Sequence, residues 1–405
     1  MASLGEWDLD LRRIKMQIEA IEIGNYRLFR QAKLTDFPRL SVMIGPNGSG
    51  KSTLFDVFTF LKDALAQNVV RAVNRRGGFK ELVSRGEQGP ISITIKFREK
   101  DGPLVTYTLK ISSDKDHRPY IARELLKYRR GRHGKPWHFV DFKKGKGTAI
   151  TNETAYGQQG AEEDRKPYDL DDPSVLAIKG LGQFKEFRIV AEFRSLIESW
   201  HISDFHIADA RPSTEFGYSD HLSTNGDNVA QVAQYLFENK RFIFDRILGQ
   251  MKKRVPGVSA VEPKLTEDGR LVLRFTDGSF QDPFIARYVS DGTIKMFAYL
   301  VLLYDSQPYP LLAIEEPENQ LYPNLMHELV EEFREYARLG GQVFVSTHSP
   351  DFLNATQLDE LYLLGKQGGF TNIQRVSKNK VLKKLVEEGD KLGELWRQGL
   401  FEKSL

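Results

Sequence analysis

Short apolar runs and longer amphipathic segments alternate along the last third of the chain. The runs at residues 311–315 (LLAIE) and 343–346 (VFVS) have the length and composition of buried strands. Residues 292–304 and 323–338 carry apolar side chains at helical spacing. Such alternation is typical of a parallel sheet with crossover helices, so we expect an α/β fold with a mixed or parallel sheet core flanked by helices.

The first half of the chain predicts an additional antiparallel β lobe. Residues 91–97 and 105–111 both alternate apolar and polar positions, and the sequence EKDGP lies between them. Two alternating runs separated by a turn signal predict a hairpin with one buried face. Upstream, residues 40–44 (LSVMI) indicate a short buried strand, and residues 53–65 indicate a helix.

The pattern of hydrophobic and polar positions is weaker in the middle of the chain. We expect residues 127–170 to be irregular and polar, residues 228–255 to form a helical insertion, and residues 271–275 (LVLRF) to form a strand. The tail, residues 378–405, reads as an amphipathic docking helix or a plain terminus. The expected parts are an N-terminal lobe at 1–210 with a polar insertion at about 112–170, an insertion at 211–284, and a C-terminal lobe at 285–405.

Composition narrows the class of protein. The chain has 405 residues, 40% hydrophobic and 28% charged, with a formal net charge of +3 and no cysteine. The absence of cysteine excludes disulfides, thiolate catalysis and zinc held by cysteine. The composition fits a cytoplasmic globular protein. No apolar run reaches the roughly 18 residues that a membrane helix needs, and the start, MASLGEWDLDLRR, lacks the apolar core of a secretory signal.

The segment GPNGSGKST has the spacing GxxxxGK[ST] of a phosphate-binding loop. It follows the predicted strand at 40–44 and precedes the predicted helix, which is the context that this motif requires. Glycines let backbone N–H groups surround a phosphate chain, the lysine neutralises its charge, and the serine hydroxyl completes a Mg²⁺ shell. The predicted nucleotide-binding residues are Gly45, Pro46, Asn47, Gly48, Ser49, Gly50, Lys51, Ser52 and Thr53.

Two adjacent carboxylates end the predicted strand at 311–315, in LLAIEEPENQLYP. Read alone, Glu315 and Glu316 are also compatible with solvated charges at a strand end. In a protein with a phosphate-binding loop, a buried strand that ends in carboxylates is expected next to that loop. Because side chains alternate along a strand, we expect the two to face opposite sides. We assign Glu315, with Ser52, to the metal and Glu316 to the attacking water.

Two further segments agree with an ATP site. THSP follows the strand VFVS and places His348 at a strand end, where it can sense the γ-phosphate. VSDGT precedes the predicted helix at 292–304, so Ser290, Gly292 and the helix N-terminus form a second small anion site. A capped turn is the alternative interpretation of that segment. Across a dimer, it could close over the ATP of a partner.

The motifs GPNGSGKST, VSDGT, AIEEPENQLYP and STHSP, in this order, resemble ABC-type ATPases of the RecF/SMC and overcoming-lysogenization-defect lineage, often described as AAA-family ATPases. The resemblance covers residues 16–60 and 285–352. It implies a P-loop NTPase fold of ABC-ATPase type, with Walker A at 45–52, a signature motif at 290–292, Walker B ending at Glu315 and Glu316, and His348 as the switch histidine. It also implies ATP and Mg²⁺ as cofactors, ATP hydrolysis, and a homo-oligomer with composite ATP sites.

Several positions depart from the family pattern. The first Walker B acid is Glu315 where the family usually has Asp, and the signature reads SDGT rather than SGGQ, which argues against a transporter subunit. Gln88 and Gln183 are weak candidates for the Q-loop glutamine. Tyr26 and Phe29 match aromatic positions that lie near the nucleotide in the family, although core packing is the better interpretation.

Nucleases of the overcoming-lysogenization-defect type carry a Toprim domain after the ATPase, and residues 349–405 are too few for one. The chain is most similar to stand-alone anti-phage defence ATPases such as that of the PARIS system. This analogy implies a separate Toprim-type nuclease-like effector, with nucleic acid or a phage protein as a further partner. The main hypothesis is a nucleotide-dependent scaffold and sensor in defence. The alternatives are a RecF/SMC-like DNA repair ATPase and, less favoured, a transporter ATPase.

A basic and aromatic segment, KYRRGRHGKPWHFVDFKKGK at 127–146, is the candidate partner surface. Basic side chains suit a phosphate backbone, and interleaved aromatics suit base stacking. An acidic protein surface fits equally well, and a solvated hairpin is the slightly favoured alternative. A second basic stretch spans residues 71–85, after the predicted phosphate-loop helix.

Overall fold

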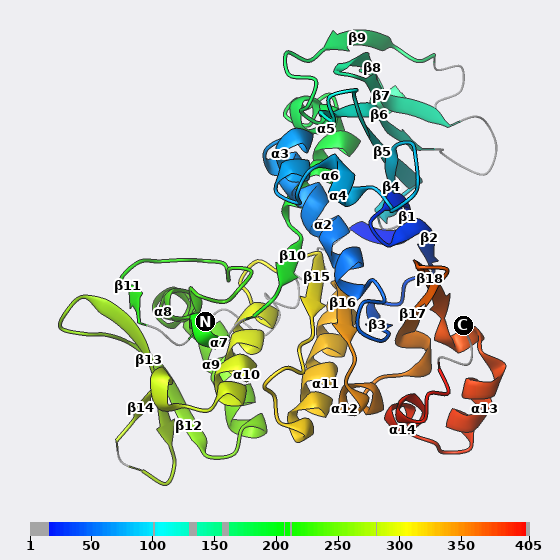
Figure 1. Cartoon of the computed structure of the whole chain (residues 1–405). Coiled ribbons are helices and arrows are strands. Elements are labelled where there is room, and N and C mark those ends of the chain that lie inside the picture. Colours follow the sequence, from blue (N-terminus) through cyan, green and yellow to red (C-terminus); the bar gives the residue numbers. More distant parts are fainter. Residues whose placement is uncertain are drawn as a thin grey trace.

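A computed structural model describes residues 16–99, 102–128, 136–155, 162–205, 207–210, 213–280 and 282–401. Residues 1–15, which we judged not to be a secretory signal, lie outside the described ranges. The described residues form three sheets (Figure 1). The sheet of eight strands stands at one end, the sheet of four strands at another, and the sheet of six strands lies at the junction between them. None of the described helices is both long and apolar enough to cross a membrane.

The eight-stranded sheet is antiparallel and forms the predicted β lobe. Its order is β2 (Phe29–Thr35), β1 (Met16–Tyr26), β4 (Ile91–Glu99), β5 (Leu104–Ser113), β6 (Pro119–Tyr128), β7 (Trp137–Lys143), β8 (Lys146–Ile150) and β9 (Arg165–Asp169). The alternation of β4 and β5 buries one face. On that face, the Phe97 ring stacks at 4.4 Å on Phe193 of α6 (Arg188–Glu198).

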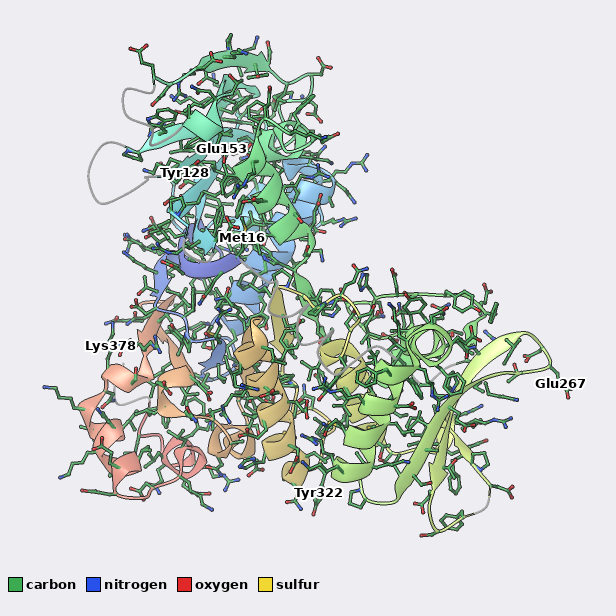
Figure 2. All side chains as sticks on the ribbon, turned by 180° about the vertical axis from the view of Figure 1, so that it is seen from behind. Met16, Tyr128, Glu153, Glu267, Tyr322 and Lys378 are labelled. Atoms are coloured by element: carbon green, nitrogen blue, oxygen red, sulfur yellow. The ribbon has the colours of Figure 1, made fainter. Side chains whose placement is uncertain are left out.

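The prediction that residues 127–170 are irregular was wrong. β7, β8 and β9 lie in this range and extend the sheet in consecutive antiparallel pairs. Their polar character reflects a sheet that is partly exposed, since β9 has no fully buried residue. Figure 2 shows Tyr128 and Glu153 near one another in this lobe, where the tyrosine hydroxyl donates to the glutamate at 3.4 Å.

The six-stranded sheet positions the candidate site. Its order is β10 (His201–Ser203), β15 (Leu311–Glu315), β16 (Gln342–Thr347), β3 (Leu40–Ile44), β17 (Leu361–Gln367) and β18 (Phe370–Arg375). All neighbours are parallel except β18, which pairs antiparallel with β17. Leu311 and Ala313 belong to one apolar core, and Leu312 and Ile314 belong to the other. Burial on both faces explains the uninterrupted apolar runs.

Helices cover the faces of this sheet. They are α2 (Lys51–Ala66), α10 (Asp291–Leu303) and α11 (Pro323–Leu339), where we expected helices at 53–65, 292–304 and 323–338. Residues of α2 belong to the core shared with the β lobe, and residues of α10 and α11 belong to the other core. The predicted α/β fold with a mixed sheet, flanking helices and an antiparallel β lobe is confirmed.

The region 228–255, expected to be helical, contains two helices: α8 (Val229–Asn239) and α9 (Arg241–Arg254). Lys240 separates them because its backbone, at φ −134° and ψ 47°, leaves the helical region. Both helices pack on the four-stranded sheet. Its strands are β11 (Thr214–Glu215), β12 (Val258–Leu265), β13 (Arg270–Asp277) and β14 (Phe284–Ile285).

The tail folds back on its own chain. Leu392 and Leu395 of α14 (Leu392–Arg397) are buried, and the Gly393 N–H donates to the Asn354 side chain of α12 (Pro350–Asn354) at 2.7 Å. The shorter helices are α3 (Val69–Asn74), α4 (Phe79–Leu82), α5 (Ala177–Leu181), α7 (Ile207–Ala210), α12 (Pro350–Asn354), α13 (Lys380–Glu387) and α14 (Leu392–Arg397). The division into parts at 1–210, 211–284 and 285–405 stays a prediction.

Candidate nucleotide-binding site

The carboxyl ends of three neighbouring parallel strands meet at one edge of the central sheet. Glu315 of β15 pairs with Ser346 of β16, and Thr347 of β16 pairs with Ile44 of β3. The loops that follow therefore leave the sheet side by side. In open α/β sheets, ligands bind outside these strand ends.

The glycines of the 45–53 loop are required by its close packing. A Cβ on Gly45 would lie 2.3 Å from the Leu364 carbonyl oxygen, and one on Gly50 would lie 2.5 Å from Oγ1 of Thr371. Gly50 also has a φ of 104°, which favours glycine. The hydroxyl of Thr371 donates to the Ser49 carbonyl at 2.7 Å. The loop is thus clamped by the β17–β18 hairpin, while Pro46, Asn47 and Gly48 are exposed and Thr53 is buried.

Lys51 opens α2 and reaches back over the loop. Its Nζ donates to the Gly45 carbonyl at 2.7 Å and to the Pro46 carbonyl at 3.2 Å. Burial lowers the pKa of Lys51, and the negative field of nearby carboxylates opposes this shift; these are Glu316, Glu318 and Glu315. A cation beside three carboxylates has the charges that a phosphate chain together with a divalent metal would require.

Glu315 and Ser52 lie together at the end of β15 and the start of α2. Burial raises the pKa of Glu315, while a hydrogen bond from the Ser52 side chain opposes that shift. A hydroxyl and a carboxylate side by side are the oxygen donors that Mg²⁺ prefers. The donor set therefore fits the predicted metal position.

Glu316 has left the strand. β15 ends at Glu315, and Glu316 has a φ of 41° in the left-handed region. The argument from strand alternation therefore does not apply to this pair, although the two carboxylates do have different partners. Oε1 of Glu316 lies 3.3 Å from Nδ1 of His348, and Oε2 accepts a hydrogen bond from Asn319 at 3.0 Å. The side chain is about one-third exposed.

The structure adds Glu318, which sequence reasoning missed. Its buried Oε1 accepts hydrogen bonds from the Thr347 hydroxyl at 2.6 Å and from the His348 N–H at 3.1 Å. The only signal in the sequence is an acid directly after the Glu316-Pro317 turn. Acids in turns are normally exposed, so its type and position alone predict a solvated charge.

Asp204 is a second acid near this edge. It follows β10, whose Ser203 pairs with Ile314 of β15, and its charge contributes to the raised pKa of Glu315. The sequence SDFHIADARPS contains it, but nothing in that segment marks it as part of the site. The register of β10 against β15 was needed to place it there.

The predicted second anion site lies apart from the phosphate loop. Ser290 caps α10 by accepting from the Thr293 N–H at 3.3 Å, and a Cβ on Gly292 would lie 3.3 Å from the Gln320 carbonyl. Both line a pocket of about 840 Å³ with Lys253 and the start of α11. Figure 2 shows Tyr322, which lines the same pocket, at that start. No residue of 45–53 lines this pocket.

Other candidates from the sequence lie elsewhere. Tyr26 and Phe29 are fully buried, and the Tyr26 hydroxyl donates to Asp56 at 2.6 Å, which supports the core interpretation. Gln88 is exposed in the loop before β4, and Gln183 donates to a carbonyl of α5 at 3.3 Å. Neither observation connects these glutamines with the phosphate loop.

In the basic and aromatic segment at 127–146, most of the aromatic side chains that the structure describes pack inside the β lobe. Phe139 and Phe142 are buried in the β-lobe core, and the Tyr128 ring stacks on Phe139 at 4.1 Å. These rings are not available for stacking on bases. Residues 129–135 lie outside the described residues. In the 71–85 stretch, Arg76 is buried in ion pairs with Asp56 at 2.7 Å and with Asp63 at 2.9 Å.

The fold and the strand-end site define a P-loop ATPase fold of the SMC-head, ABC type. The chain is similar to the crystal structure of an SmcHead bound to the C-winged helix domain of ScpA (TM-score 0.52, 13% identity, 90% of this chain and 99% of that one). It is also similar to the Smc head domain with an extended coiled coil bound to the C-terminal domain of ScpA derived from Pyrococcus furiosus (TM-score 0.53, 13% identity, 93% and 100%).

The chain belongs to the family described as "AAA domain, putative AbiEii toxin, Type IV TA system", whose model matches residues 40–354. Among curated proteins, it is 33% identical over 104 residues to the chromosome partition protein Smc of Thermoplasma acidophilum and 29% identical over 86 residues to the DNA replication and repair protein RecF of Idiomarina loihiensis. These alignments cover 25% and 21% of this chain, and only 9% and 22% of those proteins. The predicted SMC/RecF lineage is confirmed.

Proposed function

We propose that this protein binds and hydrolyses ATP at the edge formed by β3, β15 and β16. The observation that carries the proposal is the meeting of Lys51, Glu315, Glu316 and His348 at adjacent strand ends. Phosphoryl transfer to water requires charge neutralisation, a metal position and a group that orients the water. The family membership supports the same reaction.

Each side chain has a role in this proposal. The loop at 45–53 surrounds the phosphates with backbone N–H groups, and Lys51 neutralises the terminal phosphates. Ser52 and Glu315 would hold Mg²⁺, which shields the phosphate charge when bound. The carboxylate of Glu316 orients a water and accepts its proton, and His348 donates a hydrogen bond to the γ-phosphate.

We propose that two copies of the chain complete each ATP site. Ser290 and Gly292 line a pocket without any phosphate-loop residue, so their anion site is available to a second copy. The N-terminus of the 13-residue α10 provides N–H groups for the phosphates of the partner's nucleotide.

The first experiment measures the native mass of Glu316→Gln with and without Mg·ATP, together with phosphate release by the wild type. The proposal predicts Mg²⁺-dependent phosphate release by the wild type. It also predicts a nucleotide-dependent dimer of the variant. A wild-type protein that releases no phosphate would contradict hydrolysis. A variant that binds ATP but stays monomeric would contradict the composite site.

For the biological role, we propose a nucleotide-dependent scaffold and sensor in prokaryotic anti-phage defence that controls a separate Toprim-type effector. The family description, which names a toxin of a toxin–antitoxin system, supports a role in defence. The similarity to PARIS-type ATPases is part of this proposal. A phage-challenge assay with the neighbouring genes tests it, with Lys51→Ala as the inactive control.

A RecF/SMC-like role in DNA repair is the second candidate, and the alignments with Smc and RecF favour it. It predicts DNA binding that strengthens with ATP and weakens steeply with salt, because counterions are released from the DNA. Titration of labelled duplex DNA at several salt concentrations distinguishes the candidates. Absence of salt-sensitive DNA binding in the ATP state would count against the repair role and favour the defence scaffold.

A further inference from the structure

Glu318 connects two of the strand-end segments that the proposed reaction needs. It lies in the turn after Glu316, and its Oε1 accepts hydrogen bonds from the Thr347 hydroxyl at 2.6 Å and from the His348 N–H at 3.1 Å. The same oxygen lies 3.7 Å from Nδ1 of His348. One carboxylate oxygen thus lies close to three atoms of Thr347, the last residue of β16, and of His348, which follows it.

Burial makes this contact energetically important. The Glu318 side chain is 7% exposed, and the Thr347 side chain with which it pairs is fully buried. Oε2 of Glu318 is buried without a hydrogen-bond partner among the described residues. A buried carboxylate is costly unless nearby groups compensate its charge.

Lys295 of α10 provides that compensation. It is almost fully buried, and its Nζ donates to the Asn319 carbonyl of the same turn at 2.8 Å. Burial lowers the pKa of Lys295 to about 8, while the charge of Glu318 opposes that shift. The turn is therefore held on one side by β16 and on the other by the helix that begins at the Ser290 motif.

We infer that Glu318 is a positioning residue that orients His348 for the γ-phosphate. This inference rests on the proposed ATP hydrolysis. Glu316 and Glu318 both face Nδ1 of His348, at 3.3 Å and 3.7 Å. Carboxylates only accept hydrogen bonds, so they require an N–H at Nδ1 and turn Nε2 toward the site. Nε2 needs an N–H of its own to donate to the γ-phosphate, so the acting form of the ring carries a proton on both nitrogens.

The orientation has a direct consequence for catalysis. A group that contacts the phosphate must be held in one geometry, because small misplacements cost large factors in rate. Glu318 holds both the ring and the backbone N–H of His348, so its loss should affect the rate of hydrolysis more than the binding of ATP. Glu318 touches no expected substrate atom and acts through His348.

A double-mutant cycle tests this inference. Glu318→Ala, His348→Ala and the double variant are compared with Glu318→Gln, which keeps the oxygen acceptor but removes the charge. We expect each alanine variant to reduce kcat about tenfold or more with little change in KM for ATP. The double variant should be no more than about twofold slower than His348→Ala alone, because the two residues act as one unit. Glu318→Gln should recover part of the rate.

The control is Glu387→Gln, an exposed glutamate of α13 remote from the site. A kcat of Glu318→Ala equal to that of the wild type, or a double variant that shows the product of both effects, would overturn the inference. If Glu318→Ala does not fold, the cycle with Glu318→Gln replaces it. A wild type without ATP hydrolysis would instead contradict the proposed function.

The second measurement does not depend on activity. Selective ¹⁵N labelling of histidine reports which ring nitrogens of His348 carry a proton. We expect protons on both ring nitrogens in the wild type with a bound ATP analogue, and loss of the Nδ1 proton in Glu318→Ala. An unchanged signal in that variant would show that Glu318 does not set the ring form.

Discussion

Oε1 of Glu316 lies 3.3 Å from Nδ1 of His348, and the two residues follow the ends of neighbouring parallel strands. The left-handed φ of 41° at Glu316 turns this carboxylate out of the strand direction. The Glu316 N–H nevertheless donates to the Ser346 carbonyl at 2.9 Å, which fixes the turn against β16. The proposed proton acceptor, Glu316, and the proposed hydrogen-bond donor, His348, are thus held together beside the phosphate loop.

Replacing Glu316 by glutamine should stop hydrolysis without stopping ATP binding. The amide keeps the size of the side chain but cannot accept the proton of the attacking water, so we expect kcat to fall about a hundredfold or more. Phosphate release and the binding of a fluorescent ATP analogue are the two measurements. Turnover equal to that of the wild type would refute our choice of catalytic carboxylate. Glu387→Gln is the matched control for loss of one negative charge.

Lys51→Ala should weaken nucleotide binding. The ammonium group of Lys51 is buried against the loop carbonyls and the field of three carboxylates, so its loss leaves the phosphates facing negative charge. A charge-assisted contact of this kind corresponds to roughly tenfold or more in affinity. Titration calorimetry with Mg·ATP measures the effect. Lys80→Ala, at an exposed lysine of α4, should bind like the wild type.

The neighbours Arg75 and Arg76 provide a matched test of how burial changes the contribution of an ion pair to stability. Both pair with Asp63, but the side chain of Arg75 is 54% exposed and that of Arg76 is 7% exposed. Arg76 also pairs with Asp56, so Arg76→Ala leaves two carboxylates without their buried partner. We expect Arg76→Ala to lower the free energy of unfolding by about 3 kcal/mol, and Arg75→Ala by less than about 1 kcal/mol. Urea unfolding of both variants measures these changes. Equal losses of unfolding free energy in the two variants would contradict the argument.

The sequence predicted the parts of the site that depend on local patterns. Continuous apolar runs mark parallel strands buried on both faces, and the glycine spacing marks the 45–53 loop, so Lys51, Ser52 and Glu315 could be placed in advance. These residues lie within a few positions of a strand end. Their positions follow from parallel strands having their carboxyl ends on one edge.

Residues with distant partners could not be placed in this way. Glu318 is buried and accepts a hydrogen bond from Thr347, 29 positions away, and no local pattern distinguishes it from an exposed acid. Asp204 is near Glu315 only through the pairing of β10 with β15. Phe139 and Phe142 appeared available for stacking because the polar residues around them concealed a strand.

Glu124 should make stability depend on pH. It is a residue of β6 and is buried, and it accepts hydrogen bonds from the Ala177 and Ile178 N–H groups of α5 and from the Tyr107 hydroxyl of β5. Burial raises its pKa from 4.5 to about 7, although the three donors oppose the shift. The folded state therefore binds this proton more tightly than the unfolded state.

The sign of the effect follows from proton linkage. Between pH 4.5 and about 7 the folded protein carries more protons at Glu124, so stability falls as the pH rises through this window. The wild type should lose on the order of 3 kcal/mol relative to Glu124→Gln between pH 4.5 and 8, because the amide does not titrate. Urea unfolding across this range measures the difference between the two proteins. Glu387→Gln should follow the wild type, whereas parallel curves for the wild type and Glu124→Gln would show that folding does not change the pKa of Glu124.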